Sequence, residues 1–107
     1  MISVMLDVEG MRLEIKGHAG SAPKGQDMVC AAVSTLAYTL LYNLQLILNK
    51  DEYTATMNEG DALIVARPHP ILNPIQTEKC QDLFMTIGNG LCMLAEQYDQ
   101  YIHFEGN

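Results

Sequence analysis

Two residues of this chain could do nucleophilic chemistry together: His18, at the end of a strand-like run, and Cys30, twelve positions later. A thiol attacks a carbonyl only after a base has taken its proton, and an imidazole is a common base. Asp27 stands where it can cap a helix that begins at Met28. Because the start of a helix favours negative charge, this arrangement favours a thiolate at Cys30.

Each of these residues also has a simpler interpretation. A free cysteine is often a small buried hydrophobic residue, and an outward-facing histidine at a strand end is often only solvated. Asp27 could act solely as a helix cap, or it could also orient His18 as the third member of a triad does. Ser34, one helical turn after Cys30, could border the site or could bond back to the helix backbone. From the residues alone, both sets of interpretations stay open.

The connection over residues 19–26 is rich in small and turn-forming residues. Because it joins the two candidate catalytic residues, we expect it to lie beside the site, contact the substrate and close over it as a lid. The candidate substrate-loop residues are Gly20, Ser21, Ala22, Pro23, Lys24, Gly25 and Gln26. Backbone N–H groups at the helix start, including that of Cys30, are candidate donors to an oxyanion.

Composition narrows the class of protein. A chain of 107 residues with 49% hydrophobic residues is predicted to form a single domain over residues 1–107. The formal charge of −7 argues against binding of nucleic acid, and so against an RNA-binding domain. The three cysteines show no metal-ligand spacing, so we expect no metal and no organic cofactor.

Location is also predicted from the composition. The N-terminal residues 1–4 lack the basic segment of a signal peptide, and free cysteines suit a reducing compartment. Ser34, Thr35, Thr39 and Asn43 interrupt the apolar stretch after Cys30, so we expect no membrane-spanning segment. The predicted location is therefore cytoplasmic.

Hydrophobic periodicity divides the chain into seven elements. Strand patterns cover residues 2–8, 11–18, 53–58, 62–66 and 100–105, and helix patterns cover residues 28–48 and 74–98. In the first two strands the apolar set alternates with polar residues, which places His18 on the outward face. The continuous apolar run over 62–66 predicts a central strand.

The resulting order ββαββαβ predicts an α+β fold, with a single sheet of about five strands and two helices packed on one face. Gly88 and Gly90 would let the second helix approach the first closely. The first helix is apolar on more sides than one sheet can cover, so a second helix or a partner subunit must cover the rest.

The sequence resembles the ribosomal-processing cysteine protease family, Prp, over nearly its whole length. The resemblance is carried by Gly17-His18-Ala19, by Gly25, and by the run Asp27-Met28-Val29-Cys30-Ala31-Ala32-Val33-Ser34. The family typically has isoleucine at the position of Met28, which is a conservative difference. Residues 20–24 lack the aromatic and acidic residues that the family often has there, and this difference bears on substrate preference.

The resemblance implies a cysteine endopeptidase that removes the N-terminal extension of a large-subunit ribosomal protein precursor, with related enzymes acting on phage structural proteins. It implies that His18 and Cys30 are the catalytic pair, that the partner is the N-terminal peptide of the precursor, and that the protein is a homodimer. The alternative is a non-catalytic ribosome-associated or assembly module that keeps the same fold.

Overall fold

The structure is a computed structural model that describes residues 1–18, 20 and 27–106. Its elements are β1 (Ile2–Asp7), β2 (Arg12–Lys16), α1 (Met28–Ile47), a short 3₁₀ helix η1 (Lys50–Glu52), β3 (Tyr53–Asn58), β4 (Asp61–Ala66), α2 (Pro74–Gln97) and β5 (Ile102–Gly106). The predicted element order ββαββαβ is confirmed. The predicted substrate loop, apart from Gly20, lies outside the described residues.

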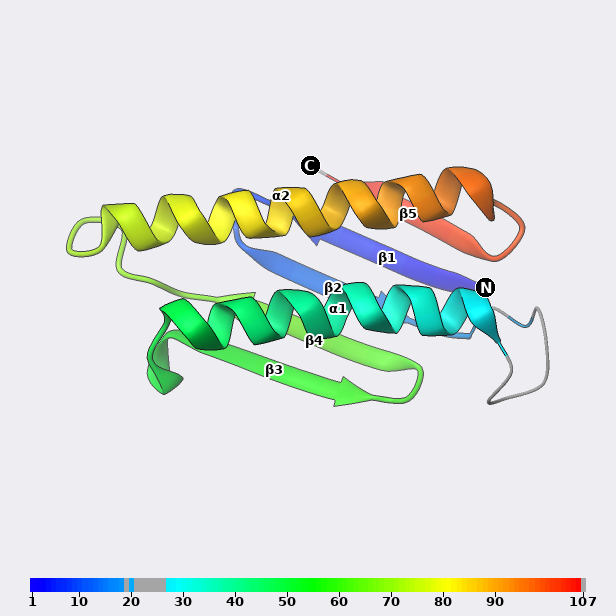
Figure 1. Cartoon of the computed structure of the whole chain (residues 1–107), viewed down its shortest axis with the longest axis horizontal. Helices are drawn as coiled ribbons and strands as arrows, with labels where there is room; N and C mark the ends of the chain where they lie inside the picture. The colour runs from blue at the N-terminus through cyan, green and yellow to red at the C-terminus, as the bar shows by residue number, and fades with distance from the viewer. Residues whose placement is uncertain (19, 21–26, 107) are drawn as a thin grey trace.

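One mixed sheet carries both helices on the same face (Figure 1). Its strand order is β3-β4-β2-β1-β5, in which β5 runs parallel to β1 and the other pairs are antiparallel. The predicted α+β class is therefore confirmed. The apolar strand β4 lies inside the sheet, between β3 and β2, although the middle position belongs to β2.

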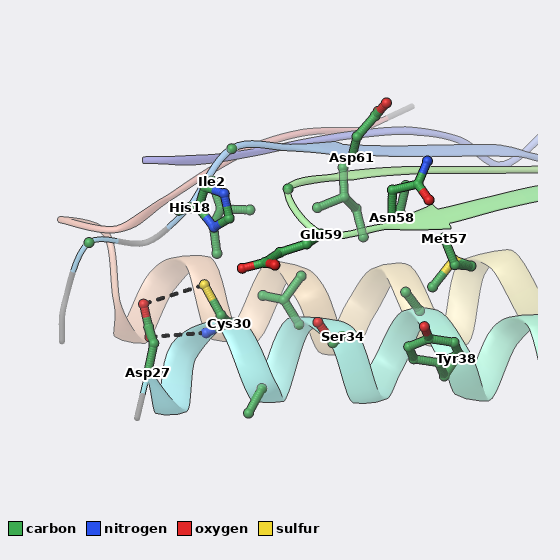
Figure 2. Close-up of a pocket in the computed structure, with 18 residues that line it drawn as sticks. Ile2, His18, Asp27, Cys30, Ser34, Tyr38, Met57, Asn58, Glu59 and Asp61 are labelled. Carbon is green, nitrogen blue, oxygen red and sulfur yellow. Dashed lines mark hydrogen bonds between the residues drawn. The ribbon is translucent and has the colours of Figure 1, made fainter. Parts of the chain in front are cut away.

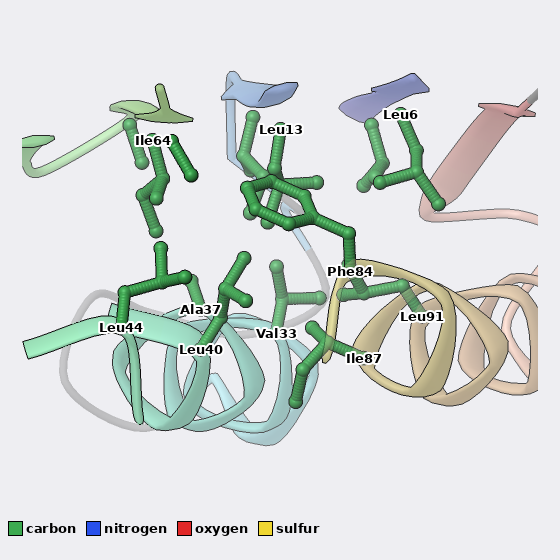
Figure 3. Packing of buried hydrophobic residues seen from close by; sticks show 14 of the residues in the cluster. Leu6, Leu13, Val33, Ala37, Leu40, Leu44, Ile64, Phe84, Ile87 and Leu91 are labelled. Atoms are coloured by element: carbon green, nitrogen blue, oxygen red, sulfur yellow. The ribbon is translucent and has the colours of Figure 1, made fainter. Parts of the chain in front are cut away.

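The core lies between the sheet and the two helices (Figure 3). The buried face of α1 consists of Val29, Val33, Ala37, Leu40 and Leu44, at the three-four spacing of one helix face. The buried face of α2 consists of Cys80, Phe84, Ile87, Gly88 and Leu91. The sheet contributes alternate residues of β1, β2 and β4, as predicted for β1 and β2, among them Ile2, Val4, Leu6, Leu13, Ile15 and Ile64.

The two glycines of α2 have different neighbours. A side chain at Gly90 would come within 3.2 Å of Leu36 on α1, so this glycine lies at the predicted close contact between helices. A side chain at Gly88 would instead collide with Leu6 of β1. The prediction that both glycines serve the helix pair is wrong for Gly88, because that side of α2 faces the sheet.

Helix α1 contains no charged residue and, contrary to expectation, is long and apolar enough by length and composition to cross a membrane. A core helix of a soluble protein passes the same test, and here one face of α1 packs into the core. Three polar side chains, those of Thr35, Thr39 and Asn43, each donate to the carbonyl oxygen four residues earlier, at 2.7–2.8 Å. These polar groups are thereby satisfied within the helix, so they interrupt its apolar character less than their types suggest.

Candidate active site

The imidazole of His18 lies on the helix side of the sheet, not on the outward face that strand alternation predicts (Figure 2). β2 ends at Lys16, and Gly17 has a φ of 94°, in the left-handed region. This conformation breaks the two-residue alternation, so His18 turns toward the helices. The Gly17 N–H donates to the Gly60 carbonyl oxygen at 2.9 Å, and the Met1 nitrogen donates to the His18 carbonyl oxygen at 2.6 Å.

Asp27 is the N-cap of α1, as predicted. Its Oδ1 accepts from the backbone N–H groups of Val29 and Cys30 at 3.0 and 3.1 Å. Its Oδ2 accepts from the Cys30 thiol, with 3.3 Å between Sγ and Oδ2. One carboxylate therefore closes the helix start and holds the thiol, which makes Asp27 a direct neighbour of the candidate nucleophile (Figure 2).

The capping bond has a consequence for the predicted oxyanion donors. The Cys30 N–H donates to Asp27 in this structure, and its role as an oxyanion donor stays a prediction. The positive end of the helix dipole is likewise partly balanced by the Asp27 carboxylate. His18, whose imidazole can accept a proton, lines the wall of the same cleft that faces Cys30.

His18, Asp27 and Cys30 line one cleft of about 940 Å³. Its walls are the first turns of α1, the end of β2 and the turn between β3 and β4. Ser34 and Gly20 also line the cleft. All the candidate site residues that the structure describes therefore lie in its walls. A cleft of this size with a thiol and an imidazole in its walls can hold an extended peptide segment.

The β3–β4 turn is part of the cleft, and no motif predicted it. The turn contributes Glu59 and Gly60, and the strand ends beside it contribute Met57, Asn58 and Asp61. Tyr38 of α1 also lines the cleft. The strand pairing explains why this turn lies beside His18. Lys16 at the end of β2 pairs with Asp61 at the start of β4, so His18 and the β3–β4 turn lie at the same end of the sheet. This register is a signal that could be used only once β4 was known to pair with β2.

Gly60 allows His18 to lie where it does. Its φ is 73°, and a side chain there would come within 2.7 Å of the His18 Nε2 atom. The bare backbone of the turn thus forms the surface against which the imidazole rests.

The other two thiols lie outside this cleft. Cys80 is completely buried in α2, and burial, with the Glu52 carboxylate adding to it, raises its pKa to about 11. Cys92 lies further along α2, with its Sγ 3.9 Å from the Glu96 carboxylate. Cys80 is thus held as a neutral thiol within the core.

The other histidines are engaged elsewhere. The His69 Nδ1 accepts from the N–H groups of Ile71 and Leu72 at 3.2 and 3.0 Å, and His103 lies 3.1 Å from the Glu105 carboxylate. Within residues 1–18, 20 and 27–106, no group of three or more His, Cys, Asp or Glu side chains could hold a metal ion. His18 is the histidine that shares a cleft with a cysteine.

The sequence model of one protein family, described as cysteine protease Prp, matches residues 1–103 of the chain. The chain belongs to the cysteine protease Prp family. The predicted resemblance is therefore confirmed, and the matched residues include His18, Asp27 and Cys30. A comparison with curated protein sequences gave no match.

Solved structures share the Prp fold. The ribosomal processing protease Prp from Staphylococcus aureus, in complex with a covalently linked product peptide, matches with a TM-score of 0.77 and 21% identity over 100% of both chains. The same protease with a substrate peptide matches with a TM-score of 0.76 and 18% identity over 100% of both chains. SMU.848 from Streptococcus mutans is 31% identical, with a TM-score of 0.69, and the match covers 98% of this chain and 90% of that one.

Proposed function

We propose that the chain is an endopeptidase that removes the N-terminal extension from the precursor of a large-subunit ribosomal protein, with Cys30 as nucleophile and His18 as general acid and base. The observation that carries this proposal is the meeting of His18 and Cys30 in one cleft, from elements that are separate in the sequence. Membership of the Prp family and the peptide complexes of the Staphylococcus aureus protease support the choice of substrate.

The proposed reaction needs only side chains and water. Cys30 gives its thiol proton to His18, and Sγ attacks the carbonyl carbon of the scissile bond to form a tetrahedral oxyanion. Collapse of this intermediate breaks the C–N bond, His18 protonates the leaving amine, and a thioester remains on Cys30. Water then attacks the thioester while His18 takes its proton, and the acid product leaves as that proton returns to Sγ. No metal or organic cofactor enters these steps.

Asp27 has a double role in this proposal. As the N-cap it fixes the first turn of α1, and as the acceptor for the thiol it sets the direction of Sγ before reaction. Ser34 borders the cleft one turn further along, where it can contact substrate.

A cleavage assay tests the protease function. A synthetic peptide that spans the N-terminal extension and the first residues of a candidate ribosomal precursor is incubated with the wild-type protein, with Cys30→Ala and with Cys92→Ala. We expect cleavage by the wild type and by Cys92→Ala, whose thiol lies outside the cleft, and loss of about 10⁴-fold or more in kcat for Cys30→Ala. Binding of the peptide without cleavage by the wild type would instead support the non-catalytic module.

We also propose that the protein is a homodimer through its helical layer. A groove of about 410 Å³ on this layer is lined by Ala32, Thr35, Leu36, Gly90, Met93, Leu94 and Gln97. Exposed apolar side chains extend the surface: Tyr42 is 63% exposed, Leu46 is 64% exposed and Met93 is 69% exposed. Patches of this kind mark interaction sites.

Sedimentation equilibrium at micromolar concentration tests the dimer. We expect a mass of twice the 11.9 kDa of one chain, and a shift toward one chain for Met93→Glu, which would place a charge in the groove. A wild-type protein that sediments as 11.9 kDa contradicts the proposal. With a ribosomal precursor as substrate, the proposed place of action is the cytoplasm, where such precursors are made.

A further inference from the structure

We propose that the open edge of β3 binds one side of the substrate peptide as an added strand, through the main-chain groups of Tyr53, Ala55 and Met57. This inference deepens the proposed protease function, since it states how the peptide is held beside Cys30. Main-chain recognition by an added strand gives affinity that depends little on the peptide's side chains.

The register of β3 shows which of its residues face the edge. The Arg67 N–H donates to the Glu52 carbonyl oxygen at 2.6 Å, so the main-chain groups of residue 52 point toward β4. Residues along a strand alternate in direction, so Thr54, Thr56 and Asn58 also point toward β4, in register with Val65, Leu63 and Asp61.

The opposite main-chain groups therefore belong to Tyr53, Ala55 and Met57. The hydrogen bonds between β4 and β2 support this assignment. The Ala66 N–H donates to the Met11 carbonyl oxygen at 3.0 Å, so the even-numbered residues of β4 bond to β2 and the odd-numbered residues bond to β3. Among the strands that the structure describes, none pairs with the outer side of β3.

The open edge is continuous with the catalytic cleft. Met57 and Asn58 of β3 line the cleft together with Cys30, Ser34 and Tyr38 of α1. Figure 2 shows Met57 facing Tyr38, further along the helix from Cys30. The eight residues from Cys30 to Tyr38 span about 12 Å of helix, which is the length of about four residues of extended chain. A peptide in contact with Sγ thus reaches the edge within a few residues.

The composition of β3 supports a partner at its edge. Natural edge strands are protected by charges, proline or bulges, but β3 reads Tyr-Thr-Ala-Thr-Met-Asn, without a charge or a proline, and its pairing with β4 is unbroken. The opposite edge strand, β5, carries the charged residue Glu105, with His103 Nε2 3.1 Å from its carboxylate. The unprotected edge is therefore the one beside Cys30, which favours the substrate as its occupant.

A series of peptides, each methylated at one backbone nitrogen, tests the added strand. In an added strand every second peptide N–H points to β3, so we expect KM to rise about fivefold at alternate positions and little at the positions between, with kcat nearly unchanged. The intervening positions are matched internal controls, because each carries the same methyl group. Equal effects at all positions, or no effect on KM on either side of the scissile bond, would overturn the proposal.

Ala55→Pro provides the matching change in the protein. Proline is tolerated where the N–H of an edge strand does not bond within the sheet, so we expect the variant to fold, to show a raised KM, and to lose the sensitivity to one of the methyl groups.

Sedimentation equilibrium of the Ala55→Pro variant tests whether the edge binds the substrate peptide or a second copy of the chain. A change from dimer to monomer with an unchanged KM would show that a second copy binds there and would overturn the proposal. Failure of the wild type to cleave the unmethylated peptide would overturn both proposals.

Discussion

Cys30 and Cys80 lie on different helices over the same face of one sheet, yet their surroundings are opposite. Cys30 lines a cleft, and its thiol donates to a carboxylate. Cys80 is completely buried, and its pKa is raised to about 11. Both lie in the first or second turn of their helices, so position along the helix does not account for the difference. We expect burial to make Cys80 the less reactive thiol, because burial penalises its thiolate.

Alkylation measures the contrast directly. In the folded protein we expect iodoacetamide to modify Cys30 at least about a thousandfold faster than Cys80, which reacts only when the core opens. Peptide mass mapping over time gives the modification rate of each thiol. In denaturant the rates for Cys30 and Cys80 should become similar. Similar rates for Cys30 and Cys80 in the native protein would break the comparison.

Gly60→Ala tests how far the surroundings of Cys30 depend on the β3–β4 turn. The added carbon would lie against the His18 Nε2 atom and would also strain the backbone at a φ of 73°, so His18 must move. We expect kcat for the peptide substrate to fall by about 10² fold, with a loss of about 1–2 kcal/mol in the free energy of unfolding.

Gly106→Ala is the control for this variant. It also adds a carbon at a tight contact, but against the movable ring of Phe104 at the far edge of the sheet. We expect its kcat to equal that of the wild type. An unchanged kcat for Gly60→Ala in a folded protein would show that His18 need not rest against the turn.

The raised pKa of Cys80 predicts a loss of stability in alkaline solution. Between pH 9 and pH 11 the thiol ionises in the unfolded chain, whose reference pKa is 9.0, while the folded protein keeps the proton up to about 11. The unfolded state therefore binds fewer protons, and the free energy of unfolding falls as pH rises, by about 3 kcal/mol.

Urea denaturation at several pH values measures this loss. Cys80→Ala should lack this part of the pH dependence although it is less stable overall, and Cys92→Ala should keep it. Parallel curves for the wild type and Cys80→Ala would mean that burial does not penalise the Cys80 thiolate.

The sequence carried much of the fold because the relevant signals are local. The alternation of Ile2, Val4 and Leu6 identified the buried face of β1, and Asp27 was identified as the cap of α1 from its place before an apolar helix. The motif around His18 and Cys30 indicated the family. The role of residues 19–26 as a substrate lid, the dimer and the catalytic roles stay predictions.

Other features followed from contacts between distant segments. The side to which His18 points depends on the left-handed conformation of Gly17, and the surface it rests on belongs to Gly60, more than forty positions away in the sequence. Periodicity cannot supply such facts, since it tells which face of a strand is buried but not which strand lies beside it.

The sequence by itself determined the order of elements, their buried faces and the two residues suited to thiol chemistry. Only the tertiary structure decided that β4 pairs with β2, which brings the β3–β4 turn to Cys30, and that β3 is left with an open edge beside the cleft. The physical reason is that apolar patterns act through nearest neighbours along the chain, whereas strand order depends on how the whole core packs at once.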